Sequence, residues 1–508
     1  MTNHTKKCCL PVLLALTVLI MTGCKPGANN DAATMPPVEP VDNVVLICID
    51  TVRWDTWWVP ERAGFEDEFT RWGQQALVMS RAASTAPWTV PAVGSVLTGL
   101  YPSQHGGGLF KSEVANLAKQ VPSALIPGLP TLPAILNEQG VRTLGVSSHP
   151  WFQASYGFEQ GFDDLHLRAK TARVTGHGFE MLDAVDTASE RFLLYLHYME
   201  AHDQHLDLEQ SRQRAADLDP GRRQNLLDTA PEAACDDPDS DICARYLTYA
   251  ETVLKLRREI AVILRELNDR GLLDSTLVMV YSDHGEEFHD HLQVGLERNV
   301  DPRGIYGFGH GQSLYQEQLH VPLLVWHPQY GGRNVDEAVS LVDVLPGIID
   351  WMGLDLPTEI QYPGKSLAGP VERAASAAFT ASDFGQRWPG NSERNLFASG
   401  IAYGPEQMAV IEGPAKLIWH QIDNSREFYN LQTDPMELTP DPSMPDKLAG
   451  RLDDALDRYF GWYDSREFLP PELTDEVIEK LKGVGYLQGV ESDSSDSGER
   501  ETEDDGNP

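Results

Sequence analysis

The chain has 508 residues, of which 41% are hydrophobic, so it is long enough for a large α/β core with an appended smaller unit. Its formal net charge is −36, from 76 acidic and 40 basic residues. Such a chain lacks the basic surface needed to neutralise many phosphates, which argues against nucleic-acid binding. The same charge disfavours broad contact with anionic membrane surfaces.

Residues 1–23 have the pattern of a targeting segment. Lys6 and Lys7 precede a short apolar run, residues 8–20, and small residues then precede Cys24. This pattern indicates a bacterial lipoprotein signal, with cleavage before Cys24 and lipid on its sulfur. We therefore expect an exported, membrane-anchored protein that faces the periplasm or the cell exterior and touches the membrane only through this lipid. An ordinary secretory signal or an uncleaved anchor is the alternative.

Residues 24–42 are expected to form a disordered tether. Cys48 lies in an apolar run and is expected to be an inert core residue. Cys235 and Cys243 bracket a polar stretch, and we expect them to form a disulfide in an oxidising compartment. An acidic calcium loop is the rival interpretation, although the stretch lacks the register of an EF-hand.

Strand and helix patterns alternate along the chain. Residues 43–50, 191–199 and 275–285 are apolar, β-branched runs that each end in polar side chains, whereas 131–140 and 249–271 have helical patterns. This alternation predicts an α/β fold with a doubly wound sheet, whose ligands bind at the carboxyl ends of the strands. Residues 205–245 are charged and weakly periodic, and we expect them to form an insertion at the edge of the site.

The pattern changes after about residue 395. Residues 407–431 alternate and turn like an antiparallel hairpin, and residues 471–487 have the pattern of a final helix. We expect a catalytic α/β domain over 43–395, a C-terminal subdomain over 396–488, and a disordered acidic tail over 489–508.

Thr89 precedes a helix that we expect to start near Pro91. Backbone N–H groups and the helix dipole favour an anion at such a position. A hydroxyl held there by a metal ion can act as a nucleophile. The simpler alternative is that Thr89 only caps the helix.

Asp283 and His284 follow a predicted strand, and Asp50 follows another. Two carboxylates and an imidazole form a mixed oxygen and nitrogen set that suits Zn²⁺, Mn²⁺ or Ca²⁺. We expect one divalent ion, held by Asp50, Thr89, Asp283 and His284.

Histidines supply the remaining candidates. His197, His202 and His205 follow a strand within nine residues, and His310 lies in a glycine-rich loop. His202 and His310 are expected to act as general acids, whereas His197, nearest the strand, is expected to be a core residue. Arg53 and Arg81 are candidates for positively charged side chains near the substrate pocket. The alternative is that each is simply a surface residue.

Together these segments, from about Asn43 to Leu487, resemble the sulfatase family of the alkaline phosphatase superfamily. The segments that carry the resemblance include, in order, "NVVLICIDTVRWD", "TVPAVGSVLTGLYPSQHG", "YSDHGEEF", "GHGQSLYQEQLHVPLLV" and "SLVDVLPGIIDWMGL", and a closing hairpin from Ala415. It implies an alkaline-phosphatase-like doubly wound mixed sheet with a smaller C-terminal α+β subdomain. It also implies a metal-dependent hydrolase or transferase acting on ester bonds.

The chain departs from the family pattern at three points. Residues 89–93 read Thr-Val-Pro-Ala-Val, where family sulfatases carry a Cys or Ser that becomes formylglycine, followed by Pro-Ser-Arg. Position 51 is Thr where a second Asp is usual, and 147–149 replaces the sulfate-holding Gly-Lys-Trp-His motif. The remaining set is similar to relatives that transfer phosphoryl groups through a metal-bound threonine.

This resemblance implies a covalent Thr89 intermediate on a phosphoester or phosphonate ester. The substrate would be a small molecule or an ester linked to a lipid or glycan. Glu200, His202 and His310 could imitate the second metal group of two-metal relatives, but a single-metal site is expected. Two alternatives stay open: hydrolysis of a sulfuric ester without formylglycine, and a lipoprotein that binds metal or another ligand without turnover.

Overall fold

The computed structural model describes residues 39–108, 122–152, 156–167, 171–203, 207–298, 306–327, 329, 332–368, 395–400, 407–420, 423–443, 446–463, 474–475 and 478–479. The predicted signal, Cys24, the tether up to residue 38, His205 and the acidic tail lie outside these residues. So does most of the expected final helix, residues 471–487.

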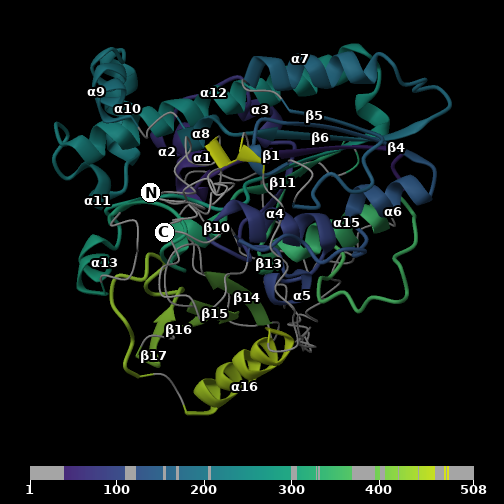
Figure 1. Cartoon of the computed structure of the whole chain (residues 1–508). Coiled ribbons are helices and arrows are strands. Elements are labelled where there is room, and N and C mark those ends of the chain that lie inside the picture. The colour runs from purple at the N-terminus through teal and green to yellow at the C-terminus, as the bar shows by residue number, and fades with distance from the viewer. Residues whose placement is uncertain are drawn as a thin grey trace, which may run out of the picture.

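An eight-stranded mixed sheet forms the centre of the fold, with helices on both faces (Figure 1). Its strands lie in the order β12-β2-β11-β7-β1-β6-β4-β5, and β7, β1, β6, β4 and β5 are parallel neighbours. The antiparallel strand β11 joins this parallel block to the parallel pair β2 and β12. The strands are β1 (Asn43–Ile49), β2 (Leu77–Met79), β4 (Val141–Ser147), β5 (Asp164–Leu167), β6 (Arg191–Tyr198), β7 (Thr276–Tyr281), β11 (Leu323–Trp326) and β12 (Arg333–Val335).

Strand β1 shows why the sheet must be covered on both faces. All seven of its residues are buried, as expected for the centre of a parallel sheet. Val44, Leu46 and Cys48 belong to one core and the alternate residues to another, because successive side chains point to opposite faces. The first core includes α4 (Thr89–Thr98), α6 (Leu132–Glu138) and α15 (Val344–Trp351); the second includes α1 (Trp54–Trp57), α2 (Val59–Ala63), α7 (Thr171–Leu182) and α12 (Asp241–Asp269).

The charged segment 205–245 is more regular than its sequence indicates. Past residues 204–206, it contains α9 (Leu208–Ala216), α10 (Pro220–Thr229) and α11 (Glu232–Cys235), and α12 begins at Asp241, eight residues before the expected start. Asp207, Asp219 and Ser240 accept backbone hydrogen bonds at the starts of α9, α10 and α12, which explains why these polar segments become helical. Cys235 and Cys243 form a disulfide that ties α11 to α12.

The C-terminal part contains more than the expected hairpin. Four antiparallel strands form a sheet, and α16 (Asp446–Tyr463), which the sequence reading missed, packs on it through Leu452, Ala455 and Leu456. The strands are β14 (Asn395–Gly400), β15 (Gln407–Glu412), β16 (Ala415–His420) and β17 (Ser425–Asn430).

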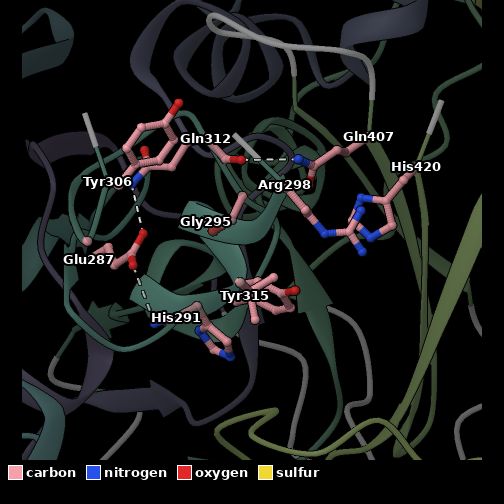
Figure 2. A pocket seen from close by; sticks show the side chains of 12 residues that line it. Glu287, His291, Gly295, Arg298, Tyr306, Gln312, Tyr315, Gln407 and His420 are labelled. Atoms are coloured by element: carbon pink, nitrogen blue, oxygen red, sulfur yellow. Dashed lines mark hydrogen bonds between the residues drawn. The ribbon is translucent and has the colours of Figure 1, made fainter. Parts of the chain in front are cut away.

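This sheet contacts the core beside α13 (Leu292–Arg298). Figure 2 shows a small cavity there, where Gln407 Nε2 donates to the Gln312 carbonyl at 3.1 Å and His291 stacks on Tyr315. Among the described residues, no helix combines the length and the apolar composition needed to cross a bilayer.

The remaining elements are short. They are α3 (Thr70–Gly73), β3 (Ala82–Ala83), α5 (Pro102–His105), η2 (Pro150–Phe152), α8 (Glu200–Asp203), η3 (Leu273–Ser275), β8 (Glu287–Phe288), β9 (Phe308–Gly309), α14 (Gln316–Leu319), β10 (His320–Val321), β13 (Val339–Ser340) and η4 (Leu341–Asp343).

Candidate active site

Four neighbouring parallel strands bring polar side chains to one edge of the sheet. In the order β7, β1, β6 and β4, they carry Asp283 with His284, Asp50, His197 and His149 at or just beyond their carboxyl ends. Cys48 of β1 is in register with His197 of β6, and Ser147 of β4 is also in register with His197. The topology alone therefore places these side chains in one row.

Asp50, Asp283 and His284 are fully buried and offer three ligand atoms that lie within 4.8 Å of one another. His284 Nε2 lies 3.5 Å from Asp50 Oδ1 and 3.5 Å from Asp283 Oδ2. Thr89 Oγ1 lies 3.3 Å from the same nitrogen. The four side chains expected to share a metal ion are therefore brought together.

The hydrogen bonding of His284 favours a cation between these atoms. Its Nδ1 donates to the Gly285 carbonyl at 2.9 Å, so the neutral ring presents the Nε2 lone pair to the two carboxylates. Both oxygens of Asp50 and Oδ2 of Asp283 are buried and accept no hydrogen bond from the described residues. Acceptors that face one another without hydrogens are unfavourable unless a cation binds them, so the residues fit a divalent ion.

The second oxygen of Asp50 faces two further histidines. Asp50 Oδ2 lies 3.4 Å from His149 Nε2 and 3.5 Å from His197 Nε2, and both rings are buried. His197 is fully buried on β6, as expected for a core residue, and the strand also places its ring against Asp50. His149 is not among the candidates predicted from sequence, although it lies just past the end of β4, as the other site residues lie past their strands.

The backbone around His149 fixes which nitrogen carries the proton. The Trp151 N–H donates to His149 Nδ1 at 3.2 Å, so the neutral ring carries its hydrogen on Nε2, facing Asp50. Burial lowers the pKa of His149 well below its usual value, with only partial opposition from Asp50. His149 is therefore a neutral donor beside Asp50 and not a metal ligand through Nε2.

The pKa values of the two aspartates shift in opposite directions. Burial opposes ionisation of Asp50, but the neighbouring His197, His149 and His284 hold its pKa well below its usual range. Burial and the nearby Asp50 raise the pKa of Asp283 to about 6. Two carboxylates this close repel each other in the absence of a cation.

Thr89 is the first residue of α4, where we had expected it just before the helix. The N-cap is Trp88, which makes no side-chain capping bond, so capping does not explain the Thr89 hydroxyl. The hydroxyl lies instead beside His284, at the end of the helix where the dipole favours negative charge.

Thr51 adopts a left-handed backbone, with φ of 61°, directly after Asp50. A β-branched residue rarely adopts this conformation, and it costs on the order of 1–3 kcal/mol. The conformation directs the Thr51 N–H to Asp283 Oδ1 at 3.3 Å, and the Val52 N–H to Ser282 Oγ at 2.7 Å. The strained turn follows β1, and these two hydrogen bonds connect it to the end of β7.

His202 of α8 and His310, just beyond β9, complete the cluster. The His202 and His310 ring centroids are 4.9 Å apart, and His310 lies 4.4 Å from the His284 ring. His310 Nδ1 donates to Glu286 Oε1 at 3.2 Å, which places the lone pair of the neutral ring on Nε2. Burial lowers the pKa of His310 to about 3, although Glu286 opposes this shift. Glu286 is a functional candidate that the sequence reading missed, although it lies in the quoted motif "SDHGEEF".

Neither arginine candidate is a surface residue. Arg53 and Arg81 are both buried. Arg53 forms ion pairs of 2.7 Å with Asp55 and Asp290 and donates to the Glu286 carbonyl at 3.0 Å. It therefore stabilises the loop that follows β7. Arg81 donates to the Asp336 carbonyl. The cluster described above contains histidines but no arginine or lysine, so an anionic group bound there needs a metal ion or imidazole N–H groups to balance its charge.

The site holds two buried carboxylates, an imidazole and a helix-borne hydroxyl at the strand ends of a doubly wound sheet, and these residues fit an ester-cleaving hydrolase. A family model described as Sulfatase matches residues 42–354, more than half of the chain. The protein belongs to the sulfatase family.

Curated relatives match over shorter stretches. Arylsulfatase K of Xenopus laevis is 33% identical over 99 residues, which cover 19% of this chain and 16% of the relative. Human N-sulphoglucosamine sulphohydrolase is 24% identical over 319 residues, 58% of this chain and 57% of the relative. These matches therefore span less than two thirds of either relative.

Solved structures agree over most of the chain. The phosphonate monoester hydrolase of Silicibacter pomeroyi is similar with a TM-score of 0.56 and 18% identity, over 84% of this chain and 96% of that one. A protein solved with its substrate D-glucosamine-2-N,6-O-disulfate is similar with a TM-score of 0.59 and 16% sequence identity. The match covers 84% of this chain and 99% of that one. At such identities the similarity establishes the fold alone, and it agrees with the predicted α/β class and small C-terminal sheet.

Proposed function

We propose that this protein is a metal-dependent hydrolase or transferase that cleaves a phosphoester or phosphonate ester through a covalent Thr89 intermediate. The observation that carries the proposal is the position of Thr89 Oγ1, 3.3 Å from His284 Nε2 and at the start of α4. It is a hydroxyl at the one point where the helix terminus and the candidate metal ligands meet.

Asp50, Asp283 and His284 would hold the ion, with Thr89 as a further ligand. A bound divalent ion would lower the pKa of the Thr89 hydroxyl and withdraw negative charge from the reacting phosphoryl group. His149 Nε2 faces Asp50 Oδ2 at 3.4 Å and would help to orient that carboxylate. The N–H groups at the start of α4 stabilise charge that develops on the non-bridging oxygens.

Thr89 Oγ1 forms a bond to phosphorus while the bond to the leaving oxygen breaks, which gives a phosphothreonine and an alcohol. The threonine proton goes to Nε2 of the neutral His310 and is returned to the leaving oxygen, so the proton balance closes. His202, beside His310, is the second candidate for the acid. Water or an acceptor alcohol then attacks the phosphothreonine and releases Thr89.

A sulfuric ester is the alternative substrate, and one observation favours it: the curated relatives include arylsulfatases. Position 89 is the reason to rank it second, because threonine cannot be converted to the formylglycine on which sulfatases depend. Binding of metal without turnover is the remaining alternative.

We also propose that the protein is exported and anchored by lipid on Cys24, from the pattern of residues 1–24. Expression of wild type and Cys24→Ala, followed by membrane fractionation, tests this. Wild type should sediment with membranes and the variant should not. Equal distribution of the two would contradict the lipid anchor.

The function is tested by stripping the full-length protein of metal, reloading it with Zn²⁺, Mn²⁺ or Ca²⁺, and assaying p-nitrophenyl phosphate, its diester, a phosphonate ester and p-nitrophenyl sulfate. Thr89→Ala should lose on the order of 10³-fold or more in kcat, and Thr89→Ser should retain measurable activity. Thr98→Ala, at the other end of α4, is the matched control. A loss below tenfold in Thr89→Ala, or turnover of the sulfate alone, contradicts the proposal.

A further inference from the structure

The short helix α14 packs against the loop that follows β7 and carries His284. The Gly285 N–H donates to the Gln318 carbonyl at 2.9 Å, and the Glu286 N–H donates to the Glu317 carbonyl at 3.0 Å. A Cβ at Gly285 would lie 2.0 Å from the Glu317 carbonyl oxygen, so only glycine allows so close an approach. The Gly285 carbonyl in turn accepts from His284 Nδ1. The backbone of α14 therefore holds the loop that orients the His284 ring.

The side chain of Gln318 extends from α14 to a second loop, residues 309–313, which carries His310. Gln318 is fully buried. Its Oε1 accepts from the Gly311 N–H at 2.9 Å, and its Nε2 donates to Ser313 Oγ at 2.8 Å. Because an amide nitrogen cannot accept the Gly311 bond, these two contacts fix the orientation of the amide group. One residue is therefore bonded to the loops of both histidines.

The loop around His310 depends on such contacts for its shape. Gly309 and Gly311, on either side of His310, have φ of 90° and 88°, and glycine adopts these angles without being confined to them. Gly309 is held in a short antiparallel ladder with Glu287. On the other side of His310, the first backbone N–H is the one that is bonded to Gln318. The Gln318 amide therefore limits how far the His310 ring can move.

The helix α14 is itself held by the C-terminal part of the chain. Lys416 of β16 is fully buried, donates to the Leu314 carbonyl at 2.6 Å and forms an ion pair of 2.7 Å with Glu437. Glu437 Oε2 accepts from the N–H of Gln316, the first residue of α14, at 2.8 Å. Breaking a buried ion pair is costly, so these contacts fix the helix against the C-terminal sheet. A helix fixed in this way can act as a rigid support for the two loops.

We infer that Gln318 is a positioning residue for the ester cleavage proposed above, and the inference rests on that function. Its side chain sets the position of His310, and its carbonyl sets the loop of His284. A group that transfers a proton is effective only within hydrogen-bond reach of the reacting oxygen, and a shift of about 1 Å can cost about 10²-fold in rate. The amide of Gln318 thus keeps His310 at a working distance from the Thr89 hydroxyl and the leaving oxygen.

The first variant to test is Gln318→Met in the full-length protein. It keeps the length of the side chain and the backbone carbonyl but removes the acceptor for the Gly311 N–H. For esters with poorly acidic leaving groups, kcat should fall by at least about tenfold, because His310 no longer delivers the proton well, and p-nitrophenyl esters should lose much less. The Kd of Zn²⁺ or Mn²⁺, measured by calorimetry, should be unchanged, since the Gln318 carbonyl still accepts from Gly285.

Gln316→Met is the matched control. It places the same substitution in the same helix, at a side chain that is 4% exposed and whose amide atoms make no hydrogen bond within the described part of the chain. It should leave kcat unchanged for every leaving group, and Gln318→Glu, which keeps an oxygen acceptor, should recover most of the lost rate. An equal loss in the two methionine variants, a loss that is uniform over all leaving groups, or metal binding that weakens together with kcat would overturn the inference.

Ser313→Ala gives a second test that does not alter α14. It removes the hydrogen bond that orients the Gln318 amide, so it should show the same dependence on the leaving group, with a smaller loss of kcat. This variant decides the question if Gln318→Met fails to fold. Wild-type rates for all leaving groups in Ser313→Ala would then overturn the inference.

Hydrogen exchange separates this inference from the proposed function, because it needs neither metal nor turnover. In the metal-free protein, Gln318→Met should speed amide exchange in the peptide 306–315 and leave the peptide 283–290 unchanged. If wild type cleaves no ester but this difference is seen, the proposed function fails and the contact of Gln318 with the His310 loop is supported. If wild type cleaves esters but the exchange of 306–315 is equal in the two proteins, the inference fails and the proposed function remains.

Discussion

Asp50 Oδ1 and His284 Nε2 face each other across 3.5 Å with no hydrogen available between them in the neutral site. The proton of His284 is on Nδ1, where it is donated to the Gly285 carbonyl, and the carboxylate has none to give. Asp283 Oδ2 stands at the same distance from the same nitrogen. This arrangement of acceptors favours a cation between them.

Metal binding should therefore stabilise the fold. A divalent ion at about one hundred times its Kd is expected to add roughly 2.7 kcal/mol to the free energy of unfolding. Asp283→Asn should remove this gain, because it replaces a charged ligand, while its metal-free form should be no less stable than metal-free wild type. The measurement is thermal unfolding with and without Zn²⁺, Mn²⁺ or Ca²⁺.

Asp274→Asn, an exposed change just before β7, serves as the control for that experiment. An equal rise of Tm in wild type and Asp283→Asn would show that the ion binds elsewhere.

Glu286 should act through His310. Its carboxylate accepts from His310 Nδ1 and keeps the Nε2 lone pair directed away from it. Glu286→Gln is expected to lower kcat by about 10²-fold for esters with poorly acidic leaving groups, and far less for p-nitrophenyl esters, which need little protonation.

The double variant Glu286→Gln/His310→Gln should then be no slower than His310→Gln alone. A uniform loss for all leaving groups, or full additivity, would show that Glu286 has only a structural role.

The buried His291–Glu317 pair should make stability depend on pH. Burial would lower the pKa of His291, but Glu317, 3.0 Å away, raises it to about 10. A raised histidine pKa means that its stabilisation is complete below the ordinary value of about 6.5 and is lost as pH rises through about 10. His291→Gln should therefore cost about 3 kcal/mol at pH 6, since it leaves Glu317 unpaired, and much less at pH 10.

Chemical unfolding of both proteins at pH 6, 8 and 10 gives the comparison. A difference in the free energy of unfolding that stays constant across this range would rule out the protonated pair.

The disulfide should stabilise the α11–α12 junction. Cys235 and Cys243 are eight residues apart, and closing so short a loop is worth about 2.5 kcal/mol in the chain-entropy treatment. The Cys235→Ser/Cys243→Ser variant should lose about this amount. Identical unfolding of wild type with and without reductant would argue against the bond.

The strand ends could be predicted from sequence because burial and periodicity are local signals. Asp50, Asp283 and His284 each follow an apolar strand, and parallel strands place such residues at one edge. His149 and His197 also lie at strand ends, but their contact with Asp50 could not be predicted from sequence, because it depends on the strand order β1-β6-β4 and on register, which are set by tertiary packing.

The helices α9 to α11 and α16 were missed for a related reason. Their sequences are polar or short, and their stability comes from capping side chains such as Asp207 and from packing on α12 or on the C-terminal sheet. Periodicity alone does not report these contributions.

The central claim is that Thr89 becomes covalently phosphorylated. The most direct measurement is a rapid acid quench of the metal-loaded protein during turnover of a phosphoester, followed by mass spectrometry of the tryptic peptide 82–111. The account predicts a phosphoryl group on Thr89 that appears with substrate, disappears after substrate is exhausted, and is absent in Thr89→Ala. Turnover without any modification of that peptide, or modification at another residue, would contradict it.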